Sequence, residues 1–313
     1  MAAPQESGGL GGSGGAVGSS SVDAQHSRTR SGGRATTYPD LPDPLPVGVY
    51  DNHTHLDIHD GITPLTVCEH LDRAAAVGVV GIVQVGVDMP SSRWSVQLAA
   101  AEPRVLAAVA VHPNEAPVLA ASGDLDAALS ELNELAAHPR VRAVGETGLD
   151  FFRTGVNGRE AQFRSFEGHI DIAKRHGIAL QIHDRDAHDD VVATLKRVGA
   201  PERTVFHCFS GDAELARLAA DEGWYLSFAG TVTFSSAHNL RAALAVTPLE
   251  RMLVETDAPF LTPAPQRGRP NAPYLVPHTV RYLAAQLDVP LAEVCAALAA
   301  NTVRVYGGWQ DAA

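Results

Sequence analysis

Short apolar runs alternate with longer amphipathic segments from Val47 onward. The runs are rich in β-branched residues and place apolar side chains at successive positions, which is typical of strands that are buried on both faces. This pattern predicts eight strands. In chain order they are VGVYDNH (47–53), VVGIVQVGV (79–87), RVLAAVAVH (104–112), VRAVGE (141–146), IALQIH (178–183), TVFHCF (204–209), WYLSFAG (224–230) and RMLVETD (251–257).

The amphipathic segments between these strands predict helices, and several of them end at a glycine, as helices often do. The clearest helices are expected at 65–78, 124–138, 160–177, 190–199 and 213–223. Eight strand–helix units in this order predict a parallel sheet, and their number and length match an α/β fold of the (β/α)8 TIM-barrel type. A doubly wound open sheet is the alternative. It would need a glycine-rich phosphate-binding turn after its first strand, where this chain has DNHTHLD.

The first part of the chain differs in composition from the rest. Residues 1–45 are dominated by Gly, Ser and Pro and contain almost no side chains that could be buried. Such a segment cannot offset its conformational entropy by packing. We therefore expect a disordered tail over residues 1–45 and a single (β/α)8 domain over residues 46–310.

Charge and cysteine usage narrow the class of protein. The 313-residue chain has a formal net charge of -12, which argues against coating nucleic acid through bulk positive charge. Its three cysteines, Cys68, Cys208 and Cys295, lie far apart, so neither a disulfide framework nor a thiolate zinc site is indicated. The N-terminus lacks the pattern of a secretory signal, and no run of about 18 apolar residues occurs. We expect a cytoplasmic protein without membrane association, and no protein partner is predicted.

Imidazole and carboxylate side chains recur at the predicted C-terminal ends of five strands. These residues are His53, His55, Glu146, His183, His207 and Asp257. Active-site groups of (β/α)8 barrels come from the same ends, and the two-residue spacing of the first pair puts both imidazoles on one face of an extended segment. A single such residue is more often a supporting or surface residue. The joint occurrence predicts a metal site.

The number of donors indicates two ions. Four imidazoles and two carboxylates exceed what one tetrahedral ion needs, and Glu146, midway in strand order, is the best candidate to bridge a pair. Nitrogen and oxygen donors are compatible with Mg²⁺, Mn²⁺, Co²⁺ or Zn²⁺. The expected chemistry is hydrolysis by a metal-activated water, with Glu146 and Asp257 as the catalytic residues.

A series of motifs then carries a resemblance to a known family. In order they are DNHTHLD, VHP, VGETGLDFFR, QIHDRDA, FHCFSGD, LSFAGTVTF, LVETDAPFLTPAPQRGRPNAP and NTVRVYG. Together they resemble the TatD family of metal-dependent hydrolases from about Val47 to Tyr306. The resemblance implies a barrel of the amidohydrolase type, a divalent-metal centre and deoxyribonuclease activity on phosphodiester bonds.

The resemblance also implies how the donors divide between the two ions. One ion would be held by His53, His55, Glu146 and Asp257. The second would be held by Glu146, His183 and His207. Two departures from the family pattern are Asp184, where a Ser or Thr is usual, and ETG at 146–148 in place of EIG or ECG. Neither removes a ligand, but Asp184 would either orient His183 or make the site less hospitable to a phosphate.

Five further residues are candidates for contact with substrate. They are His112, Arg185, Arg267, Arg269 and Asn271. The arginines would clamp phosphates through their planar guanidinium groups. The histidine ends the third strand, and the asparagine lies in the stiff RGRPNAP loop. The expected substrate is DNA, as single strands or 3′ ends cut in a 3′–5′ exonuclease-like manner, with RNA or transfer RNA ends as further candidates.

Two other functions remain compatible with the residues. The same binuclear centre could attack a carbonyl, as in an ester or amide hydrolase such as a D-aminoacyl-tRNA deacylase, because the ligands do not distinguish the two bonds. A non-catalytic metal-binding protein is disfavoured because every proposed ligand is present. Cys208 follows a ligand, but nothing marks its thiol as activated, and we assign it to core packing.

Overall fold

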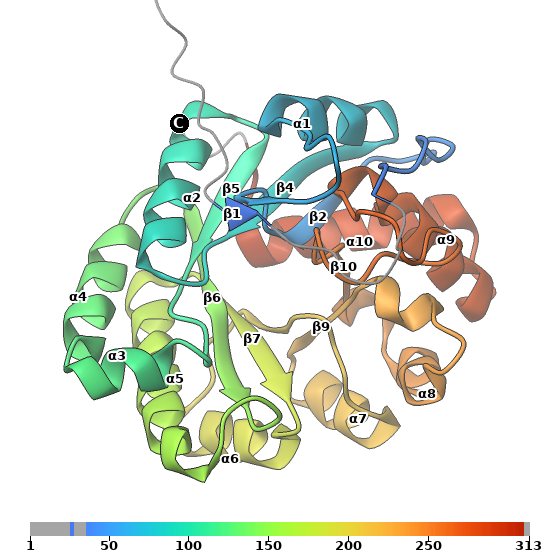
Figure 1. Ribbon diagram of the computed structural model, residues 1–313. Helices are drawn as coiled ribbons and strands as arrows, with labels where there is room; N and C mark the ends of the chain where they lie inside the picture. The colour runs from blue at the N-terminus through green and yellow to red at the C-terminus, as the bar shows by residue number, and fades with distance from the viewer. Residues whose placement is uncertain (1–25, 28–35, 310–313) are drawn as a thin grey trace, which may run out of the picture.

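Eight parallel strands lie side by side in chain order and form a nearly closed barrel surrounded by helices (Figure 1). The computed structural model describes residues 26–27 and 36–309. The barrel strands are β2 (Val49–Thr54), β4 (Val79–Val85), β5 (Val105–Val109), β6 (Val141–Asp150), β7 (Ala179–Arg185), β8 (Thr204–Phe206), β9 (Tyr225–Phe228) and β10 (Met252–Val254). Each coincides with one of the predicted runs, so the predicted (β/α)8 barrel is confirmed.

Helices cover the outside of the barrel between consecutive strands. They are α1 (Val67–Ala76), α2 (Met89–Ala101), α3 (Ala116–Ser122), α4 (Leu125–Leu135), α5 (Val156–His176), α6 (His188–Val198), α7 (Ala213–Asp221), α8 (His238–Val246), α9 (Val276–Leu287) and α10 (Leu291–Tyr306). Three short 3₁₀ helices lie in the later part of the chain: η1 (Gly230–Thr233) after β9, η2 (Leu249–Arg251) before β10, and η3 (Pro273–Leu275) before α9. Helix α1 starts at a capping box in which Thr66 and Glu69 bond each other's backbone N–H, and α5 ends at Gly177 in the left-handed conformation.

The observed strand ends differ from the predicted ones. Strand β6 continues beyond Glu146 and β7 continues beyond His183, because the two strands stay paired as far as Asp150 and Arg185. Strand β8 ends one residue before His207, and β10 ends before Asp257. The ligand candidates of the later strands therefore lie on the segments that leave the barrel.

Two apolar layers hold the barrel together. The larger layer lies between the sheet and the helices, and the smaller one fills the interior with residues such as Val83, Leu106 and Leu253. At the N-terminal end of the strands, the Trp309 ring stacks on Tyr50 with ring centroids 4.1 Å apart. Because side chains fill the interior and this end, an open site has to lie at the C-terminal end of the strands.

The barrel closes between its first strand and the segment after its last. The Asp257 N–H donates to the His53 carbonyl at 3.0 Å, and the His55 N–H donates to the Ala258 carbonyl at 2.7 Å. These bonds bring the first and last ligand candidates of the chain side by side.

Part of the expected tail lies against the barrel. The Leu45 side chain is buried, and Arg269 donates to the carbonyls of Thr37 and Tyr38. Strand β1 (His26–Ser27) pairs in parallel with β3 (Ile58–His59), which follows β2. The other residues expected in the tail, 1–25 and 28–35, lie outside the described part of the chain, so the domain boundary stays a prediction.

Within the described residues, no single helix has the length and apolar composition needed to cross a membrane. The segments Pro273–Leu287 and Leu291–Tyr306 meet that requirement only as a pair, which is bent by 115°.

Candidate metal centre

Four donor atoms converge at the C-terminal end of the barrel beside the closure of β2 with the segment after β10. The Nε2 atoms of His53 and His55 are 3.3 Å apart, so the two imidazoles share one face, as their spacing indicates. Glu146 Oε2 lies 3.5 Å from His53 Nε2, and Asp257 Oδ1 lies 3.5 Å from His55 Nε2. Two imidazoles and two carboxylates thus point at one small volume.

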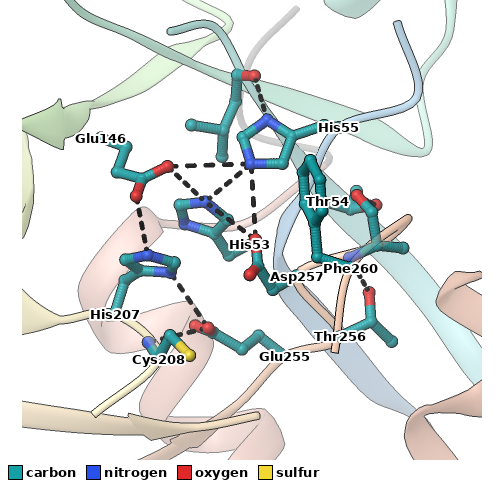
Figure 2. Close-up of polar contacts among 12 residues, drawn as sticks. His53, Thr54, His55, Glu146, His207, Cys208, Glu255, Thr256, Asp257 and Phe260 are labelled. Carbon is teal, nitrogen blue, oxygen red and sulfur yellow. Dashed lines mark hydrogen bonds and ion pairs between the residues drawn. The ribbon is translucent and has the colours of Figure 1, made fainter. Parts of the chain in front are cut away.

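The other carboxylate oxygen of Glu146 faces a second group of imidazoles. Its Oε1 atom lies 2.5 Å from His183 Nδ1, 3.0 Å from His207 Nε2 and 3.4 Å from His112 Nε2. Figure 2 shows Glu146 between His207 on one side and His53 with His55 on the other. Glu146 therefore connects the two groups of donors.

The backbone of β6 places Glu146 in this position. The pairing of β6 with β7 is irregular between Val144 and Thr147, and such bulges re-aim the side chains that they contain. Two residues later Gly148 pairs with His183. A Cβ on Gly148 would lie 2.1 Å from the His183 carbonyl oxygen, so this close approach requires glycine.

Hydrogen bonds behind two of the imidazoles fix which nitrogen faces inward. His55 Nδ1 lies 2.9 Å from the Val85 carbonyl, and His207 Nδ1 lies 3.0 Å from Glu255 Oε1. A neutral imidazole that donates through Nδ1 presents an unprotonated Nε2 lone pair on its other side. Both lone pairs then face the volume beside Glu146, as a metal ligand requires.

A second carboxylate holds His183. Asp150 Oδ2 lies 3.2 Å from His183 Nε2. The Asp150 carboxylate itself accepts from the Arg153 N–H at 2.7 Å and from Asn114 Nδ2 at 3.2 Å. These bonds tie the loop after β6 to the imidazole at the end of β7.

The carboxylates set the proton affinities of the site. Burial lowers the pKa of His55, but the hydrogen bond and negative charge of Asp257 outweigh it and raise that pKa to about 9. Burial raises the pKa of Glu146, yet the charge of His207 and the bonds from His112 and His183 bring it well below its usual value. Glu146 is therefore ionised, and its negative field attracts divalent cations as well as protons.

The donor set fits divalent metal ions. Three groups of donor atoms each lie within 4.8 Å of one another, and they comprise His53, His207 and Asp257; His53, His55 and Glu146; and His112, Glu146 and His183. Buried carboxylates and imidazoles backed by hydrogen bonds are the ligands that such ions prefer when thiolates are absent. The structure brings all six predicted ligand candidates together.

The predicted substrate-contact residues fall into different surroundings. Arg185 and Arg267 are exposed, and their guanidinium groups lie over the rings of Phe152 and Phe234 at 4.0 Å and 3.4 Å from the centroids. His112 lies within the donor group around Glu146. His112 is therefore part of the centre, and Arg185 lies two residues beyond His183 on β7.

Arg269 and Asn271 make structural contacts instead. Arg269 donates to carbonyls of the segment before β2. Asn271 is fully buried and donates to the carbonyls of Thr256 and Phe260. The buried asparagine amide is engaged in holding its own loop against the segment after β10, which corrects the expectation that this side chain contacts substrate.

Asp184 pairs with a residue of the next helix. Its Oδ2 atom lies 2.7 Å from His188 Nδ1, and the hydrogen-bond partners of His183 are Glu146 and Asp150. Orientation of His183 therefore comes from those two carboxylates and not from Asp184.

Cys208 does not have the environment of a nucleophile. Burial, together with the negative charges of Asp257 and Glu255, raises the pKa of its thiol well above the usual value. A thiol that stays protonated is a poor nucleophile. Its backbone N–H donates to Glu255 Oε1 at 2.8 Å, so the residue contributes to the site through its main chain.

Sequence reasoning missed two contributors to the centre, Glu255 and Asp150, which support imidazoles from behind. His112, predicted as a substrate contact, offers a donor atom toward Glu146. The available signal was proximity, because Glu255 is two residues from Asp257 and Asp150 is four residues from Glu146 within the motif VGETGLDFFR.

Comparisons with known proteins agree with this geometry. A family model described as TatD related DNase matches residues 50–307. The chain is 47% identical over 264 residues to the uncharacterized metal-dependent hydrolase TatD of Mycobacterium tuberculosis, which covers 83% of this chain and 98% of the relative. It is 34% identical over 259 residues to the uncharacterized metal-dependent hydrolase YabD of Bacillus subtilis, which covers 82% of this chain and 98% of the relative.

A solved structure of a TatD homolog is also similar to this chain. The crystal structure of YjjV, a TatD homolog from Escherichia coli, aligns with a TM-score of 0.74 at 29% identity and covers 83% of this chain and 98% of that chain. Since the family model spans most of the chain and the relatives are matched almost end to end, the chain belongs to the TatD family of metal-dependent hydrolases.

Proposed function

We propose that this hydrolase is a deoxyribonuclease that holds two divalent ions, Mg²⁺, Mn²⁺ or Zn²⁺, and cleaves phosphodiester bonds of DNA single strands or 3′ ends. The observation that carries the proposal is the position of Glu146, whose Oε2 faces His53 and His55 while its Oε1 faces His183 and His207. A carboxylate with one oxygen toward each of two donor groups is the arrangement that bridges a metal pair.

We assign each residue of the centre a role in binding the ions or in transferring a proton. His53, His55, Glu146 and Asp257 would hold one ion, and Glu146, His183 and His207 the other, with His112 near the second. The bound ions would neutralise the phosphate and lower the pKa of the attacking water. Asp257 would accept the proton of that water, because its side chain is 13% exposed and reaches solvent, whereas the side chain of His53 is completely buried.

Exposed arginines supply the positive charge that an acidic protein needs at its active site. Within the described residues, the guanidinium group of Arg185 makes no hydrogen bond or ion pair, so its N–H groups are available to a phosphate. Arg267 is also exposed, and its guanidinium group lies over the Phe234 ring. A cation two residues beyond His183 supports capture of a phosphodiester by a chain with a net charge of -12.

Metal-stripped protein tests the proposal directly. The stripped protein is restored separately with Mg²⁺, Mn²⁺ and Zn²⁺ and offered a 5′-labelled single-stranded DNA oligonucleotide, with Glu146→Ala and His207→Ala as inactive controls. We expect metal-dependent products shortened from the 3′ end in the unmodified protein and none in either variant.

The same preparation is offered an aminoacylated transfer RNA. Release of the amino acid with intact RNA, and no shortening of DNA with any metal, would replace the nuclease by an acyl hydrolase. Full metal-dependent cleavage by both variants would remove Glu146 and His207 from the mechanism.

We also assign the protein to the cytoplasm, an assignment supported by three cysteines that form no disulfide with one another.

A further inference from the structure

A phenylalanine ring stands in solvent beside the metal centre. Phe152 is 62% exposed in the loop that connects β6 to α5. A single exposed apolar side chain needs no explanation by itself, because folded proteins expose many. Its position and its neighbour set this ring apart from such residues.

The ring lies directly beyond residues of the centre on two adjacent strands. Phe152 lies two residues after Asp150, whose carboxylate contacts His183. Arg185 lies two residues after His183 on β7. Two residues of a strand span about 7 Å. The pair formed by Phe152 and Arg185 therefore stands at the edge of the centre, where β6 and β7 end side by side (Figure 1).

The loop holds the backbone of Phe152 in a fixed place. The Phe151 N–H donates to the Arg185 carbonyl at 2.9 Å on one side of Phe152, and the Arg153 N–H donates to Asp150 on the other. Phe151 packs inward, edge-to-face with Phe163, while Phe152 points outward. Because the backbone is held on both sides of Phe152, the loop loses little freedom when a partner stacks on the ring.

The guanidinium group of Arg185 covers one face of the ring, with its central carbon 4.0 Å from the ring centroid. Since no described residue accepts from the guanidinium of Arg185, the pair offers an aromatic face together with a cation whose N–H donors are available. Proteins bind single-stranded nucleic acid with this combination, in which a base stacks on the ring and the backbone phosphate meets positive charge.

We infer that Phe152, backed by Arg185, is a stacking platform for a base of the single-stranded nucleic acid next to the bond that is cut. The inference rests on the proposed nuclease function and names the part of the substrate that the site recognises. Stacking on a ring tolerates all bases, so the platform selects an unpaired nucleotide without selecting its sequence.

The first test compares rates of cleavage. The holoenzyme and Phe152→Ala are offered a single-stranded oligonucleotide and a matched one that lacks the base at the 3′-terminal nucleotide. We expect Phe152→Ala to lower kcat/KM on the intact oligonucleotide by roughly 5- to 150-fold, and Phe152→Trp to restore it. The losses of kcat/KM caused by removing the ring and by removing the base should not be additive, because each change abolishes the same contact.

Val156→Ala is the matched control, since Val156 is 76% exposed at the start of α5 and apolar as well. It should cleave like the unmodified protein. The platform is overturned, while the nuclease proposal stands, if Phe152→Ala and Val156→Ala have the same kcat/KM on the intact oligonucleotide. The same holds if the losses of kcat/KM from removing the ring and the base are additive.

A binding measurement separates the platform from the nuclease proposal. A 2-aminopurine base at the 3′ end of a phosphorothioate oligonucleotide loses fluorescence when it stacks on an aromatic ring. Quenching that disappears in Phe152→Ala, with no cleavage of any DNA, would retain the platform and overturn the nuclease proposal. Equal quenching in both proteins, or none in either, would overturn the platform.

Discussion

The Glu255 carboxylate accepts a hydrogen bond from His207 Nδ1 at 3.0 Å, and the same oxygen accepts one from the Cys208 N–H at 2.8 Å. On the other side of the imidazole, His207 Nε2 lies 3.0 Å from Glu146 Oε1. Glu255 is completely buried and lies too far back to bind substrate. It is a positioning residue, since it sets which nitrogen of His207 faces the metal centre.

Replacement of Glu255 should therefore act through metal affinity. Glu255→Ala removes the partner of His207 Nδ1, and we expect the affinity for the second ion and the activity to fall about 10- to 100-fold. Glu255→Gln keeps an acceptor oxygen, so its metal affinity and activity should fall less. Metal titration followed by activity assay measures both quantities. Glu250→Ala, on the exposed turn η2 before β10, should match the unmodified protein, and equal metal affinity in Glu255→Ala would contradict the role of Glu255.

Glu146 should govern how many ions the protein holds. Because its two oxygens face different groups of donors, Glu146→Ala removes a shared ligand, and we expect fewer than two ions per chain and a loss of activity greater than about 100-fold. Elemental analysis of dialysed protein gives the stoichiometry. A variant that retains two ions with full activity would show that this carboxylate is not the bridge.

The order of strands and ligand candidates could be predicted because the signals are local. Runs such as VVGIVQVGV are buried on both faces, and residues at the ends of parallel strands meet at one edge of the barrel, so His53 and Asp257 come together although they are far apart in sequence. Neither inference requires knowledge of side-chain orientation.

The supporting contacts could not be predicted, because they depend on how the side chains are oriented. Sequence reasoning considered Asp184 for the orientation of His183, because the contact with Asp150 depends on how far β6 and β7 stay paired. Asn271 looked like a rim residue because RGRPNAP is polar and stiff. Its burial depends on carbonyl groups of the segment after β10, whose positions no motif specifies.

The approach of Gly148 to His183 should make this glycine irreplaceable. A Cβ there would lie 2.1 Å from the His183 carbonyl oxygen, and its φ of 140° is strained for other residues. We expect Gly148→Ala to reduce the free energy of unfolding by roughly 2–5 kcal/mol and to displace His183. Gly123→Ala is the matched control, because Gly123 has a φ of 85° but nothing lies within 4 Å of its added Cβ, so its cost should be only about 1 kcal/mol. Equal losses in thermal unfolding would show that the contact is unimportant.

Burial of His169 should make the protein less stable in mild acid. The Val111 N–H donates to His169 Nε2 at 3.0 Å, so the imidazole has to be neutral, and burial lowers its pKa from 6.5 to about 4. Between these values the unfolded chain binds more protons, so stability contributed by the neutral imidazole is complete above about pH 6.5 and is lost as the pH falls toward 4, by roughly 3 kcal/mol. His169→Gln retains an amide donor and acceptor but cannot be protonated. Chemical unfolding at pH 7 and pH 4.5 should therefore show a smaller pH dependence in His169→Gln, whereas His238→Gln, on the surface helix α8, should retain that of the unmodified protein.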